Sequence, residues 1–164
     1  MRIETPRLVI RPFEDADRPQ VLAMWLDPAN ERAPGQPEEA VRRWAAGVPW
    51  GVWEKESGEL VGDCSLHFDE GFGEWELSYG FRRDRWGRGY ATEAARGCVE
   101  YGFAEMGVAK IVADVEPKNV ASSRVLERVG FEHVGDVEGK LFYELTPQRA
   151  ATFRSQTDGI SRDA

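Results

Sequence analysis

The sequence is poor in cysteine and histidine, with only two of each among its 164 residues. Cys64 and Cys98 stand far apart, with no CxxC spacing and no second pair, so no disulfide framework is expected. This usage fits a reducing cytoplasm, which is the expected compartment. His67 and His133 lie singly in expected strands, so we predict no metal site.

Long apolar runs are also missing. No stretch reaches the roughly 18 apolar residues that suggest a transmembrane helix. The first residues, MRIETPRLVIRPFEDAD, contain charged side chains throughout and lack the apolar h-region of a secretory signal peptide. We therefore expect neither a membrane span nor a cleaved leader.

Positive charge is scarce relative to negative charge. The chain has 21 Lys and Arg against 29 Asp and Glu, which gives a net charge of −8 and a pI near 4.9. Such a surface repels phosphate backbones and anionic lipids, so neither nucleic acid nor a membrane is an expected partner. It would weakly attract cationic partners such as amines.

The remaining composition is that of an ordinary globular protein, with 41% apolar and 30% charged residues. We predict one domain over residues 1–153 and a polar, disordered tail over residues 154–164. Apolar periodicity predicts helices after Asp15 or Asp17, from Pro37, and over 91–106 and 120–129. Strands are expected at 7–12, 50–54, 60–68, 74–81, 110–115, 131–137 and 141–145. The strand–helix–strand–helix order from residue 74 predicts a mixed α/β sheet with at least one parallel pair.

The sharpest local signal is the segment WGRGYATEA, residues 86–94, which follows an expected strand and opens a helix. Gly87 and Gly89 would let the backbone approach a ligand closely. The first amides of the following helix, together with the helix dipole, form an anion site. Four arginines flank the loop and favour a phosphate-bearing ligand: Arg82, Arg83, Arg85 and Arg88.

Other interpretations of this loop stay open. It could be a glycine turn surrounded by solvated arginines. The P-loop motif GxxxxGK[ST] is absent. A dinucleotide fingerprint matches poorly because Thr92 occupies its sixth position, although Asp114 lies where a ribose-binding acid would be expected. A nicotinamide-dependent oxidoreductase therefore remains an alternative.

Three segments together resemble the GNAT acyltransferase superfamily, and within it the branch that acetylates ribosomal-protein N-termini. They are ETPRLVIRPFEDAD near the start, ELSYGFRRDRWGRGYATEA in the middle, and NVASSRVLERVGF at residues 119–131. They occur in the family's order and spacing, and the resemblance covers about residues 4–145. It implies the GNAT fold, a mixed twisted sheet with helices on both faces.

The resemblance also implies acetyl-CoA as cofactor, held where the family's fourth and fifth strands splay apart. Loop amides would hold the pyrophosphate, strand backbone would pair with the pantetheine arm, and Asn119 would hydrogen-bond to that arm. The implied cofactor-binding residues are Tyr79, Gly80, Phe81, Gly87, Arg88, Gly89, Tyr90, Ala91, Thr92 and Asn119. Trp86 replaces the Gln or Arg that usually begins the family loop.

The resemblance implies acetyl transfer to a primary amine by direct attack in a ternary complex. Many members carry a tyrosine as the acid for the departing thiolate, but Leu126 stands at that position here. Ser122 matches the serine of the related branch and is the candidate acid, although it could instead cap or pack in its helix. Glu76 is the first candidate base and Glu116 the second; a base acting through water is also open.

The acceptor stays undetermined: a protein N-terminus and a small-molecule amine are both compatible with the sequence. Trp25, Trp44 and Trp75 could line an amine pocket, but a core position is the more ordinary expectation. A non-catalytic CoA-binding sensor is the main alternative to an enzyme. Relatives of the branch often form homodimers, so a homodimer is a further expectation without an assigned interface.

Overall fold

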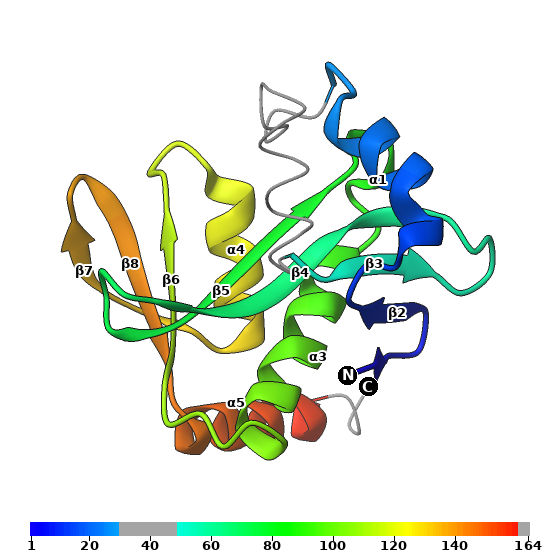
Figure 1. Ribbon diagram of the computed structural model, residues 1–164. Helices are drawn as coiled ribbons and strands as arrows, with labels where there is room; N and C mark the ends of the chain where they lie inside the picture. The colour runs from blue at the N-terminus through cyan, green and yellow to red at the C-terminus, as the bar shows by residue number, and fades with distance from the viewer. Residues whose placement is uncertain (30–48, 161–164) are drawn as a thin grey trace.

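The computed structural model describes residues 1–29 and 49–160, with side chains to residue 155. A single eight-stranded sheet has the order β1-β2-β3-β4-β5-β6-β8-β7. Figure 1 shows α3 and α4 packed beside the middle of this sheet and α5 crossing beneath α3. The mixed sheet with helices on both faces that the sequence predicted is confirmed.

The expected strands are present, and one short strand precedes them. The strands are β1 (Ile3–Glu4), β2 (Leu8–Arg11), β3 (Gly51–Glu54), β4 (Leu60–Asp69), β5 (Glu74–Phe81), β6 (Ile111–Val115), β7 (Glu132–Val137) and β8 (Lys140–Leu145). β1 pairs antiparallel with β2 and was not predicted, because two residues carry no readable alternation.

The helices are α1 (Arg18–Trp25), α3 (Tyr90–Ala104), α4 (Val120–Val129) and α5 (Pro147–Ile160), with short 3₁₀ turns at Asp15–Asp17 and Arg83–Arg85. None of these helices combines the length and hydropathy needed to cross a bilayer. The helix expected from Pro37, with Trp44, falls outside the described residues.

Helix α5 corrects one expectation. It begins at Pro147, a favourable residue for a first helical turn, and continues through residue 160. Residues 154–160, expected to be irregular, are therefore helical. The polar composition of 154–160 hid the helix, and in the part of α5 whose side chains the structure describes only Ala150 is buried in the core, which gives a weak apolar signal.

Apolar side chains form a core on each face of the sheet. The larger core lies between the sheet and α3, α4 and α5, and contains Leu66, Leu77 and Leu126. A smaller core on the other face joins α1 to Trp53 and Leu60. Successive side chains of a strand point to opposite faces of the sheet, and each face buries its own core. Neighbouring residues of β5 therefore lie in different surroundings.

Candidate active site

An opening begins where β5 and β6 separate. These two strands pair in parallel only at Trp75 with Ile111 and at Glu76 with Val112. Beyond Glu76, β5 remains paired with β4 up to Phe81, and no described strand pairs with its other edge. Beyond Glu76 this edge of β5 faces the opening, as an extended ligand arm that pairs with a strand would require, and the Phe81 carbonyl at its far end accepts from Nε1 of Trp86 at 2.9 Å. This edge is the feature expected at Tyr79, Gly80 and Phe81.

The glycine loop lies directly after β5 and leads into α3. Gly87 and Gly89 both have left-handed backbone angles, with φ of +74° and +77°. No atom lies within 4 Å of the position that a Cβ at Gly87 would occupy, so this side of the loop is open. Gly89 is the N-cap of α3, and no side chain caps the helix. The first amides of α3, at Tyr90, Ala91 and Thr92, are thus suited to an anion.

The arginines around the loop do not act as one cationic cluster. Arg82 binds Asp84, with atoms 2.8 Å apart, and Arg85 pairs with Glu54 and Glu59. Two of the four charges counted from the sequence are therefore neutralised locally. Arg83 lies over the ring of Trp86, whereas Arg88 forms no ion pair with a residue in the described ranges, so Arg88 is the loop arginine best placed for an anionic ligand.

Arg7 and Glu93 tie the N-terminal strands to this loop. Arg7 Nε lies 2.6 Å from Glu93 Oε2, and the hydroxyl of Thr5 and the backbone N–H of Arg7 donate to Glu93 Oε1. Arg7 also donates to the carbonyl of Arg88 at 2.9 Å and stacks over the ring of Tyr90. Burial alone would raise the pKa of Glu93, but these hydrogen bonds outweigh it and hold the pKa below its ordinary value.

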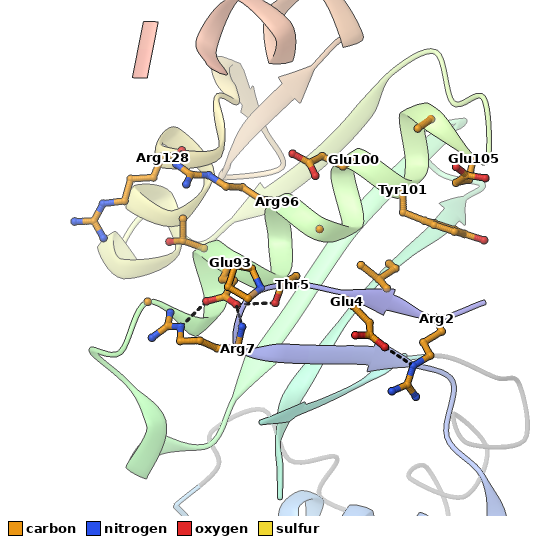
Figure 2. A pocket seen from close by; sticks show the side chains of 16 residues that line it. Arg2, Glu4, Thr5, Arg7, Glu93, Arg96, Glu100, Tyr101, Glu105 and Arg128 are labelled. Carbon is orange, nitrogen blue, oxygen red and sulfur yellow. Dashed lines mark hydrogen bonds and ion pairs between the residues drawn. The ribbon is translucent and has the colours of Figure 1, made fainter. Parts of the chain in front are cut away.

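A pocket of about 980 Å³ lies beside this ion pair, between β1 and α3. Figure 2 shows Arg7, Thr5 and Glu93 joined at one end of the pocket and Tyr101 and Glu105 at the other. Its lining touches the glycine loop only at Gly89 and Thr92. The pocket therefore adjoins the loop and is separate from the opening between β5 and β6.

Asn119 and Ser122 begin α4. Asn119 is the N-cap, and its Oδ1 accepts a hydrogen bond from the backbone N–H of Ser122 at 3.1 Å. Its side-chain amide remains for the pantetheine contact that the resemblance implies. Since Asn119 does the capping, Ser122 is free of that role. Its Oγ lies 2.9 Å from the hydroxyl of Tyr79 on β5, a side-chain partner that the sequence did not indicate.

Glu76 lies on the opposite face of β5 from Tyr79, as the predicted alternation requires. Its carboxylate is close to His67 on β4, with Oε2 and Nε2 2.9 Å apart. His67, Asp69 and Glu76 bring potential metal-ligand atoms within 4.8 Å of one another. The sequence treated His67 as isolated, because the β4–β5 register that joins the three residues was not known.

The remaining acidic candidates are less favourably placed. Glu116 is exposed just after β6, at a turn where its carbonyl accepts from Asn119. Asp114, the residue that kept a dinucleotide site open, binds Lys140 at 3.0 Å. The largely antiparallel sheet also differs from a doubly wound dinucleotide fold, which is mostly parallel.

Most of the aromatic and sulfur side chains singled out in the sequence serve the core. Trp25 is buried against Phe13, and Trp75 packs against the larger core on the face away from Glu76. Trp44 lies outside the described residues. Cys64 and Cys98 are both fully buried, and they form no disulfide, as expected.

Comparison with known proteins supports the family directly. The model of the acetyltransferase (GNAT) domain matches residues 7–132. The uncharacterised N-acetyltransferase YnaD of Bacillus subtilis is 39% identical over 82% of this chain and 85% of its own length. An Aspergillus fumigatus protein named FsC-acetyl coenzyme A-N(2)-transacetylase is 30% identical, over 98% of this chain and 81% of its own.

A solved structure agrees with the sequence relatives. The crystal structure of a GNAT-family acetyltransferase from Bacillus anthracis superimposes with a TM-score of 0.78 at 27% identity, covering 90% of this chain and 99% of that one. The chain belongs to the GNAT acetyltransferase family.

Proposed function

We propose that this acetyltransferase takes its acetyl group from acetyl-CoA and transfers it to a primary amine. The observation that carries the proposal is the separation of β5 and β6 after Glu76, next to the left-handed Gly87–Gly89 loop and the uncapped start of α3. An open strand edge suits the amide-rich pantetheine arm, and helix amides suit a pyrophosphate. The relative named as an acetyl coenzyme A transacetylase supports the same donor.

Acetyl-CoA supplies the acetyl group as a thioester, and the protein supplies positioning and proton transfer. The amine must attack in its neutral form. An α-amine is roughly 10% neutral at pH 7, whereas a lysine amine is neutral only about once in 2,500 molecules. A base is thus more important for a lysine-like acceptor, and general acid–base help is worth about 10²–10⁴-fold.

Glu76 is the proposed base. It lies at the last paired position before the strands separate, and its side chain is 16% exposed, so it can meet an acceptor without being fully solvated. Ser122 is the proposed acid, whose hydroxyl donates a proton to the departing thiolate while Tyr79 supports it by hydrogen bonding. Glu76 and Ser122 lie on opposite faces of the sheet. This suits the proposal, in which the acceptor amine reaches the base from one face and the thiolate of CoA reaches the acid from the other.

The acceptor is either a protein N-terminus or a small-molecule amine, and the net charge of −8 favours one that is cationic overall. The test incubates the full chain and acetyl-CoA with a panel of peptides and amines, and detects acetylated product by mass spectrometry. We expect product from wild type and a large loss in E76Q and S122A. Tight CoA binding with no product from any amine would favour the non-catalytic sensor instead.

A further inference from the structure

His67 lies directly opposite Glu76 in the β4–β5 ladder. The two residues are cross-strand partners, and their side chains meet with Nε2 and Oε2 2.9 Å apart. Glu76 and Val112 form the last pair between β5 and β6, so His67 contacts the carboxylate at the vertex of the opening. A side chain held at this point is well placed to control the proposed base.

The surroundings of His67 indicate how its ring is protonated. Its Nδ1 is buried and has no hydrogen-bond partner in the described part of the chain. A proton on Nδ1 would therefore be a buried donor without an acceptor, which is unfavourable. The arrangement fits a ring that donates a proton on Nε2 to Glu76.

Other charged groups around Glu76 make such a donor useful. Asp69, two residues along β4 from His67, places a carboxylate oxygen within 4.8 Å of the ligand atoms of His67 and Glu76. Lys140 is close enough that the Glu76 charge contributes to the raised pKa of its ammonium group, after the larger effect of Asp114. Without a fixed partner, the Glu76 carboxylate would be repelled by Asp69 and drawn toward Lys140.

We propose that His67 is the positioning residue for the base of acetyl transfer: its Nε2–H holds Oε2 of Glu76 and leaves Oε1 to accept the proton of the amine. This inference rests on the proposed function, and in particular on Glu76 as base. His67 itself exchanges no proton in the reaction. Its contribution is orientation, for which a misplacement of about 1 Å can cost roughly 100-fold.

Two amide substitutions separate this role from packing. The side-chain nitrogen of Gln lies close to the position of a histidine Nε2, whereas that of Asn reaches only as far as Nδ1. H67N should therefore lower kcat for acetyl transfer by about 10–100-fold. H67Q should stay within about threefold of wild type, because it restores the donor. The KM for acetyl-CoA should not change in either variant.

His133 offers a matched control. It is the second histidine of the chain and pairs with Asp136 at 3.0 Å on β7. H133N should leave kcat unchanged, and it also assigns the two histidines in nitrogen NMR spectra of the full chain. In these spectra we expect the proton of His67 on Nε2, and its signal to move in E76Q.

The outcomes are distinct. A wild-type kcat in H67N alongside an impaired E76Q would overturn the positioning role and leave the proposed function intact, as would equal losses in H67N and H67Q. A wild-type rate in E76Q would remove the base and the positioning role together. If wild type acetylates no amine, the proposed function fails. Independently of activity, a His67 ring signal that does not respond to E76Q would contradict the contact between His67 and Glu76.

Discussion

The hydroxyl of Tyr79 lies 2.9 Å from Oγ of Ser122 and 3.1 Å from the Ser122 carbonyl. This contact joins β5 to the first turn of α4, beside the opening between β5 and β6. Leu126, which occupies the position where many relatives carry an acidic tyrosine, is fully buried in the core. The Tyr79–Ser122 pair therefore provides the hydroxyl groups from which a departing thiolate could take its proton.

Removing either hydroxyl should slow acetyl transfer. S122A should lower kcat by about 10²–10⁴-fold, the range for loss of a general acid. Y79F should cost roughly fivefold, as expected for one supporting hydrogen bond of about 1 kcal/mol. Steady-state kinetics should show both losses in kcat, with an unchanged KM for acetyl-CoA. Y101F is the control, and a wild-type kcat in S122A would limit Ser122 to packing.

Two glycines allow backbone strain to be separated from ligand binding. Gly58 and Gly87 have similar left-handed φ angles, +69° and +74°, and a Cβ at either would meet nothing within 4 Å. G58A and G87A should therefore each destabilise the fold by about 1–2 kcal/mol. Only G87A should weaken acetyl-CoA binding in calorimetry, because only this glycine lies in the loop before α3. Equal affinities in the two variants would argue against the loop as the pyrophosphate site.

The Arg7–Glu93 contact predicts a specific loss of stability in acid. Hydrogen bonds from Thr5 and Arg7 outweigh the effect of burial and hold the pKa of Glu93 below its ordinary value of 4.5. A depressed carboxyl pKa stabilises the fold above that value, and the contribution is lost as the pH falls below it. E93Q should thus lower the free energy of unfolding by about 1.5–3 kcal/mol near pH 7, which lowers Tm by several degrees. The difference in Tm from wild type should shrink below about pH 4.

Glu100 is the control for this measurement. It lies on the same helix and pairs with Arg154 at 3.1 Å, but both side chains are more than half exposed. An exposed pair of this kind contributes about 0–1 kcal/mol. E100Q should therefore barely change Tm at any pH, and a loss as large as that of E93Q would show that the effect is not specific to the contact with Arg7.

The two thiols should be inert in the folded protein. Burial raises the pKa of the Cys64 thiol well above its ordinary value, and Cys98 is equally inaccessible. A thiol reagent such as DTNB should modify two groups in concentrated guanidinium chloride and react only at the rate of unfolding in native buffer. Rapid labelling of either residue in the native protein would contradict the packing between β4 and α3.

Local patterns predicted the elements that bury a regular apolar face. Helix α4 was predicted with its observed bounds, because Gly130 follows its last turn; the cap by Asn119 at its start came from the structure. The unusual backbone of the glycines before α3 and the presence of a parallel strand pair, which is β5 with β6, were likewise readable from residue type and element order.

Contacts between distant segments could not be predicted in the same way. Arg7 and Glu93 are 86 residues apart, and no local pattern connects them. His67 joins Glu76 only through the β4–β5 register, and Tyr79 reaches Ser122 only because α4 packs on that face of β5. The sequence therefore identified the separate parts of the candidate site, and folding supplied the partners that orient them.

The most direct test of the account is a thermal shift measurement on the full chain with acetyl-CoA, CoA and NAD side by side. A ligand at 100 times its dissociation constant stabilises a protein by about 2.7 kcal/mol, which for this size raises Tm by roughly 5–10 °C. We predict this rise with acetyl-CoA and CoA, a smaller one in G87A, and none with NAD. No rise with acetyl-CoA, even at millimolar concentration, would contradict the assignment of the opening and its glycine loop as an acetyl-CoA site.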